Sequence, residues 1–163
     1  MLQRIQTIYL LLAAACSVSL LFLPIYFVNI ANDTDVSATF GAYGLVSDNL
    51  LNTEIPLYLL FILWTMLSII AIFLYKNRKK QLLVCRINLL LQFLIAIGFL
   101  LFSFFGKSLL KEQLIELGHD ASEVTFSMGI GYFCLFLGIP FLLLAIRGIR
   151  NDEQLLKSLD RLR

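Results

Sequence analysis

The sequence predicts an all-α membrane protein with four transmembrane helices, and its composition is the first evidence. Of its 163 residues, 60% are hydrophobic and 15% are charged, and the mean hydropathy is +0.87. A soluble domain is usually about 45–50% apolar and about 25% charged. No Gly/Ser-rich or Pro-rich linker divides the chain, so we expect a single membrane domain over residues 1–163.

Four apolar segments are the second observation, because crossing a bilayer takes roughly 20 residues of helix. They are residues 5–28, 56–75, 82–105 and 124–146. None alternates in the way that the strands of a membrane barrel do. Backbone groups in lipid have no water to bond, so each segment is expected to be a helix.

The distribution of Lys and Arg is the third observation. Arg4 precedes the first segment, KNRKK occupies residues 76–80, and the stretch 147–163 is rich in cations. At the opposite ends of the segments only Lys107 and Lys111 are basic, whereas most of the acidic residues lie there. The positive-inside rule therefore predicts that both termini and KNRKK are cytoplasmic.

The first segment has two readings. It contains LLLAAAC, which resembles the end of a lipoprotein signal with Cys16 as the acylated residue. A signal peptide has an apolar core of roughly 7–15 residues followed by a polar start. Here the apolar run continues as SVSLLFLPIYFV, so we expect Cys16 inside a retained helix that Pro24 bends or ends.

The second and third segments carry signals that agree with their bounds. Pro56 suits a first helical turn, and Gly106 follows the third segment, where a C-terminal glycine is common. Asn88 and Gln92 share a helix face and are expected to bond to neighbouring helices. Arg86 either reaches back to the membrane interface or forms an anionic lipid-headgroup pocket with KNRKK.

The fourth segment carries small residues at a helical spacing on one face. They are Ser127, Gly131, Cys134 and Gly138. Residues 13–19 of the first segment form a similar cluster, and helices in lipid associate through small residues. We therefore expect the first and fourth segments to pack closely, the alternative being that this face meets another subunit. Pro140 predicts a kink in the fourth segment.

The stretches between the segments carry weaker patterns. SATFGAYGLVSDN, residues 37–49, predicts a small hairpin, and leucines at a helical spacing in residues 107–118 predict a short amphipathic helix. His119 has acidic neighbours, but Gly118 interrupts the helical spacing. A solvated loop is therefore expected there, and no metal site.

Residues 147–163 read as a short amphipathic C-terminal helix. Asn151 is an N-cap candidate, with Gln154 three residues on as in a capping box. A leucine stripe follows, formed by Leu155, Leu159 and Leu162. A basic amphipathic helix beside a membrane usually lies on anionic lipid or docks a partner. Nucleic acid is not an expected partner, because the tail has no aromatic residue to stack on bases.

The segments carry almost no group that performs chemistry. No Asp, Glu, His or Lys lies in the middle of a segment. An ionisable residue at depth is the usual sign of a proton relay or ion pathway. We therefore expect no enzyme, no catalytic residue and no cofactor.

The two ends of the chain resemble those of a known family. The opening MLQRIQTIYLLLA, the closing AIRGIRNDEQLLKSLDRLR and the KNRK-then-CRIN passage at residues 76–88 are similar to domain-of-unknown-function family 4293. That is a bacterial four-span inner-membrane family without an assigned activity. The resemblance implies the bacterial inner membrane and carries over no catalytic residue. The motif positions are expected at the cytoplasmic face, and they are Gln3, Arg4, Gln6, Arg147, Arg150, Asp160 and Arg161.

These patterns favour a non-enzymatic binding or assembly subunit that contacts anionic lipid headgroups, or other membrane or cytoplasmic proteins, through its basic cytoplasmic face. The expected contact residues are Arg4, Lys76, Arg78, Lys79, Lys80, Arg86, Arg147, Arg150, Leu155, Leu159, Arg161 and Leu162. The alternative is a lipid or small-molecule transporter or channel subunit. In that case Arg86, Asn88 and Gln92 line a path, Pro140 is a hinge, and a cavity reaches Arg86.

Overall fold

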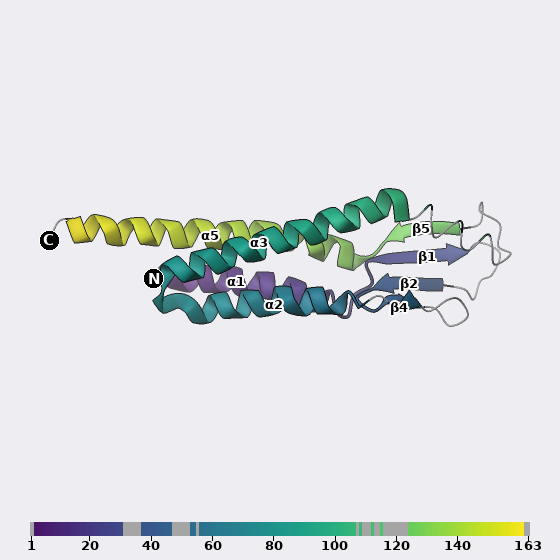
Figure 1. The fold of residues 1–163 in the computed structure, drawn as a ribbon, viewed down its shortest axis with the longest axis horizontal. Coiled ribbons are helices and arrows are strands. Elements are labelled where there is room, and N and C mark those ends of the chain that lie inside the picture. The colour runs from purple at the N-terminus through teal and green to yellow at the C-terminus, as the bar shows by residue number, and fades with distance from the viewer. Residues whose placement is uncertain are drawn as a thin grey trace.

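The protein consists of packed helices with an antiparallel sheet at one end (Figure 1). The structure, a computed structural model, describes residues 2–30, 37–46, 53–54, 56–106, 108, 112, 115 and 124–161. Within this part, three helices are long and apolar enough to cross a membrane by length and composition, and a shorter apolar helix lies near the N-terminus. The all-α prediction was wrong in class because of the sheet, although most of the described residues are helical.

The helices run side by side along the long axis of the molecule. Their bounds are Leu2–Ser19 (α1), Tyr58–Phe73 (α2), Arg78–Leu101 (α3) and Ile130–Arg161 (α5). A 3-10 turn, Leu74–Lys76, extends α2, and a π turn, Phe102–Gly106, extends α3. Helix α1 packs along α5 and α2, and α3 packs along the same two helices. The predicted close packing of the first and fourth segments is confirmed.

The described strands form one sheet beyond the helices. They are Tyr26–Ile30 (β1), Ser37–Gly41 (β2), Gly44–Val46 (β3), Thr53–Glu54 (β4) and Val124–Met128 (β5). Their order is β4-β3-β2-β1-β5, and every pair is antiparallel. The predicted hairpin is confirmed as β2 and β3, whose turn reaches Gly44 with a φ of 96°, a conformation that glycine adopts without strain.

Two of the apolar segments are helices over only part of their predicted lengths. α1 ends at Ser19, and residues 20–25, which include Pro24, connect it to β1, so the helix ends five residues before the proline. α5 begins at Ile130, because residues 124–128 form β5 instead. The pairing of β1 with β5, in which Tyr26 lies opposite Met128, joins the ends of both segments. Aromatic and β-branched residues, which both segment ends contain, are common in strands. The pairing of β1 with β5 therefore determines that these residues form strands and do not extend the helices.

The separate C-terminal helix predicted from Asn151 was also wrong. α5 continues without a break from Ile130 to Arg161 and contains Pro140. Beyond the other helices, its C-terminal part projects away from the sheet (Figure 1). The tail is therefore an extension of the fourth helix, and it does not start with a cap of its own.

The sheet is anchored to α3 through aromatic side chains. The Tyr26 hydroxyl donates a hydrogen bond of 3.1 Å to the Phe99 carbonyl oxygen. The rings of Phe40 and Phe102 stack with centroids 4.7 Å apart. A second apolar cluster, including Leu10, lies further from the sheet and joins α1 to α5. We call the two ends of the molecule the sheet end and the basic end, the latter carrying Arg78, Arg147 and Arg150.

Candidate functional site

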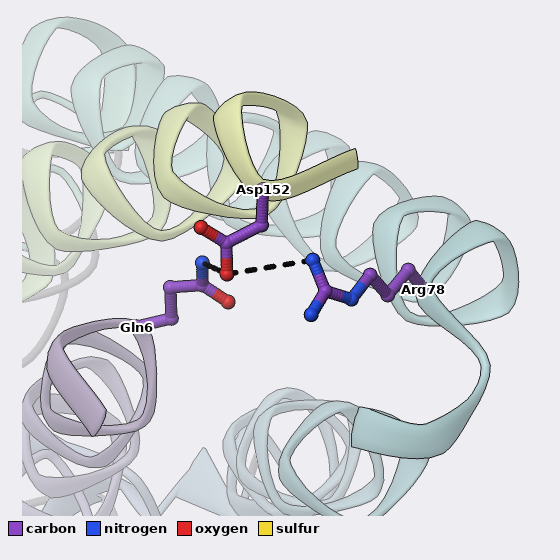
Figure 2. A network of polar contacts seen from close by, with 3 residues as sticks. All are labelled: Gln6, Arg78 and Asp152. Atoms are coloured by element: carbon purple, nitrogen blue, oxygen red, sulfur yellow. Dashed lines mark hydrogen bonds and ion pairs between the residues drawn. The ribbon is translucent and has the colours of Figure 1, made fainter. Parts of the chain in front are cut away.

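A buried carboxylate joins three helices at the basic end. The side-chain amide of Gln6 on α1 donates a hydrogen bond of 2.6 Å to Oδ2 of Asp152 on α5. Nη1 of Arg78, at the start of α3, lies 3.6 Å from the same oxygen (Figure 2). Asp152 is only 6% exposed and Gln6 only 5%. The three side chains therefore connect the N-terminal parts of α1 and α3 to the C-terminal part of α5.

Gly148 makes room for this contact. It lies one helical turn before Asp152, so both residues occupy the same face of α5. A Cβ at Gly148 would lie 2.8 Å from Cγ of Gln6, which is closer than such atoms approach. Because Gly148 has no side chain, Gln6 can pack closely against α5 and reach the Asp152 carboxylate.

The sequence patterns do not predict Asp152 as a site residue. They point to Gln6 only as a position of the family motif. A signal for Asp152 exists in the sequence, because Ala145, Ile149 and Asp152 recur at i, i+4 and i+7. All three are buried, so the carboxylate continues the inward stripe of α5. The Gln6 partner has no comparable signal, because it is 146 residues away in the chain.

Exposed cations lie on α3, on α5 and on the turn before α3, the part of the chain that also carries this buried network. They are Lys76, Lys79, Lys80, Arg86, Arg147 and Arg150, and we call them the basic surface. Arg78 differs from them, since it is partly buried and paired with Asp152. Arg86 lies about 12 Å further along the axis of α3 than Arg78, at about 1.5 Å per residue. The basic surface therefore extends along the helices from the turn before α3 to the level of Arg86, about two helical turns further.

The remaining predicted contact residues are only partly described. Leu155 is exposed on α5. The side chains of Arg4, Leu159 and Arg161, and the whole of Leu162, lie outside the described residues. The acidic neighbours of His119 also lie outside them, as does His119 itself. In the predicted amphipathic stretch 107–118, only Ser108, Glu112 and Ile115 are described, and each is helical.

Asn88 and Gln92 bond to neighbouring helices as predicted. Nδ2 of Asn88 donates to the Ser68 hydroxyl of α2 at 2.8 Å, and Nε2 of Gln92 donates to the Leu135 carbonyl oxygen of α5 at 3.0 Å. Both side chains are fully buried. These two amides therefore tie α3 to α2 and to α5.

The predicted stripe of small residues does not form one interface. Ser127 lies in β5 and is exposed, so it is not part of the helix. Gly131 packs against the backbone of Leu23 and Pro24, and its N–H donates to the Pro24 carbonyl oxygen at 3.0 Å. Gly138 instead faces the side chains of α2 and α3. Cys134 is half-buried between these two glycines.

An apolar groove of about 460 Å³ lies between α2 and α3 near the sheet end. Its lining comes from Phe40, Leu57, Leu60, Leu91, Leu94, Ile95, Gly98, Phe99 and Phe102. Arg86, Asn88 and Gln92 are not among these residues. This groove is therefore not the path that a transporter would form from those three side chains.

Comparison with known protein families gives one match over nearly the whole chain. The family model DUF4293, described as a domain of unknown function, matches residues 2–162. No curated protein matches the chain.

Proposed function

The chain belongs to the DUF4293 family, a domain of unknown function, and on that premise we propose that it is a non-enzymatic binding subunit of the bacterial inner membrane. Its basic surface binds anionic lipid headgroups on the cytoplasmic side, and the projecting part of α5 docks a protein partner. The observation that carries this proposal is the charge at the basic end. There, cations stay exposed while Asp152 is buried between Gln6 and Arg78.

The outward faces of the helices support a bilayer location. Leu94 on α3 is 68% exposed and Phe133 on α5 is 66% exposed. Leu59 and Met66 on α2 are also exposed. Soluble proteins rarely expose contiguous apolar faces of this extent, whereas a bilayer covers them at no cost. The same faces belong to helices long enough to span the hydrocarbon.

The basic surface supports an orientation in the membrane. Cations concentrate on the cytoplasmic side of membrane proteins. The basic end therefore faces the cytoplasm and the sheet lies outside. Arg86 and Arg147, which lie nearer the membrane than Arg78, extend along apolar surface and place their guanidinium groups among the headgroups. Each cation near an anionic leaflet contributes about 1 kcal/mol of attraction.

The projecting part of α5 suits a protein contact. Its residues 153–161 continue past the Asp152 network for about 14 Å, at about 1.5 Å per residue. Figure 1 shows this part extending beyond α1 and the turn between α2 and α3. Leu155 presents an apolar side chain there. A helix with exposed apolar and charged residues is a common docking element.

The transporter alternative has less support. It requires Arg86, Asn88 and Gln92 to line one path. Asn88 and Gln92 are fully buried and hydrogen-bonded to other helices, whereas Arg86 is exposed. That arrangement favours helix packing for the two amides and lipid contact for the arginine.

Lipid retention tests the headgroup contact. The full chain is purified in mild detergent from membranes that contain both anionic and zwitterionic lipid, and the retained lipids are identified by mass spectrometry. A variant with Lys79→Gln, Lys80→Gln and Arg86→Gln is expected to lose the enrichment of anionic lipid. The matched control is Lys107→Gln with Lys111→Gln, which removes basic charge between α3 and β5 and should retain it. Equal enrichment in all three proteins would contradict the lipid proposal.

Crosslinking in native membranes tests the partner contact. A chain that ends at Gln154 keeps Asp152 and its network but lacks Leu155 and the rest of the projection. We expect this shortened chain to lose crosslinked neighbours that the full chain retains. An identical set of neighbours would count against a docking role for α5.

A further inference from the structure

A group of polar side chains lies buried between α2, α3 and α5. It consists of Trp64 and Ser68 on α2 and of Asn88 and Gln92 on α3, and each of the four is 0% exposed. Within each helix the two residues are four positions apart, so they lie on one face a single turn from each other. Polar atoms in such surroundings are expected to be hydrogen-bonded, and here the pairing is incomplete.

The protein satisfies only some of these atoms. Asn88 Nδ2 donates to the Ser68 hydroxyl, which itself donates to the Trp64 carbonyl oxygen at 3.2 Å. Gln92 Nε2 donates to the Leu135 carbonyl oxygen. Three side-chain atoms have no hydrogen-bond partner among the described residues: Trp64 Nε1, Asn88 Oδ1 and Gln92 Oε1. One of them is a donor and two are acceptors.

Two of the three side chains approach each other at Gly138, and the third, Asn88, lies one helical turn away. A Cβ at Gly138 would lie 2.5 Å from Nε2 of Gln92 and 2.8 Å from Cζ2 of Trp64. Cζ2 belongs to the edge of the indole ring that also carries Nε1. Asn88 lies one turn along α3 from Gln92 and is bonded to Ser68, one turn along α2 from Trp64. Gly138 thus lets the indole and the Gln92 amide come together.

We propose that this group is an internal hydration site in the middle of the helices. A bound water accepts a hydrogen bond from the Trp64 indole N–H and donates to Asn88 Oδ1 and Gln92 Oε1. Water fits because it supplies both the acceptor and the two donors that the three atoms require. A cation would face the indole N–H, and an anion would face two carbonyl oxygens, so neither matches the set. The inference is independent of the proposed lipid and partner contacts.

The single tryptophan of the chain makes the site directly observable. The full chain is labelled with ¹⁵N at tryptophan and reconstituted in lipid nanodiscs, where it gives one indole N–H signal. We expect an NMR cross-peak between that proton and water. The variant with Asn88→Leu and Gln92→Leu lacks both acceptors, so we expect it to lose the cross-peak and to shift the indole proton upfield.

Two controls distinguish a bound water from the Ser68 hydroxyl and from a general effect of substitution in α3. Gln81→Leu makes the same substitution at another buried glutamine of α3 and should leave the cross-peak unchanged. Ser68→Ala removes the hydroxyl of the group, so a cross-peak that disappears with it would belong to that hydroxyl and overturn the proposal. An indole proton of the unaltered chain without a water cross-peak would also overturn it, whether or not the leucine variant folds. So would a cross-peak that persists in the leucine variant.

Discussion

The Gln6 amide donates a hydrogen bond to the Asp152 carboxylate, and the 2.6 Å contact joins residues 146 positions apart in the chain. It ties the beginning of the first helix to the far part of the last one. Because Arg78 approaches the same oxygen, the start of α3 is held as well. One carboxylate oxygen thus contacts the beginnings of α1 and α3 from a position on α5 that is nine residues before its end.

Removing either partner of the Gln6–Asp152 bond should destabilise the protein. A hydrogen bond to a charged group contributes about 1.5–3 kcal/mol, and loss of Gln6 leaves a buried carboxylate with Arg78 alone. A double-mutant cycle with Gln6→Ala and Asp152→Ala, measured by unfolding in detergent, should give a coupling energy in that range. The exposed residue Lys79, changed to Ala, should alter stability by less than about 0.5 kcal/mol. Additive effects of the two substitutions would show that the bond contributes nothing.

Gly148→Ala should destabilise the protein by about 1–3 kcal/mol, because the new methyl group would push Gln6 away from Asp152. The measurement is the unfolding free energy in detergent. Gly98→Ala is the matched control, since a Cβ there meets no atom within 4 Å. In that helix interior, alanine should stabilise by about 0.5–1 kcal/mol. Similar effects at both glycines would be inconsistent with close packing at Gly148.

Tyr26→Phe should lower the unfolding free energy by at least about 1 kcal/mol, because each neutral hydrogen bond of the hydroxyl usually contributes about that much. The substitution removes the bond from the hydroxyl to Phe99 and keeps the ring contacts with Phe40 and Phe102. Tyr43→Phe makes the same change at an exposed tyrosine and should have little effect. If the two variants were equally stable, the hydroxyl of Tyr26 would have no part in anchoring the sheet.

Gly131→Ala should disturb the junction between β5 and α5. A Cβ there would lie 2.8 Å from the Pro24 carbonyl oxygen and 3.0 Å from that of Leu23. These are backbone atoms, which cannot move as the end of a flexible side chain does. We expect a loss of more than about 1 kcal/mol, measured as for Gly148. A variant as stable as the unaltered protein would mean that the chain at Leu23 and Pro24 yields easily.

Local patterns predicted the features that depend on a single helix face. Asn88 and Gln92 share a face of α3 whatever surrounds them, so their role between helices followed from spacing alone. The hairpin of β2 and β3 followed from its glycines and aromatic residues in the same way. The helix ends near Lys76 and Arg78 were also close to those expected, because polar residues mark them.

Features that depend on long-range pairing were missed. Residues Tyr26–Ile30 end an apolar run, and only their pairing with β5 makes them a strand. Asn151 is a residue type that is common at helix N-caps. However, Ile149 before it and Asp152 after it are both buried positions of α5, so the helix continues through Asn151. The contact of Gln6 with Asp152 joins α1 to α5, and the sequence pattern of neither helix predicts a partner on the other.

The connection between β5 and α5 has a mechanical consequence. Only Gly129 separates the last residue of the strand from the helix, and two hydrogen bonds, from Gly129 N to Ile25 O and from Gly131 N to Pro24 O, fasten this junction. The helix that follows is 32 residues long, which corresponds to about 48 Å. The helix continues through Pro140 without a break, so a tilt imposed on the sheet is passed directly to the start of α5 rather than being absorbed in a flexible linker.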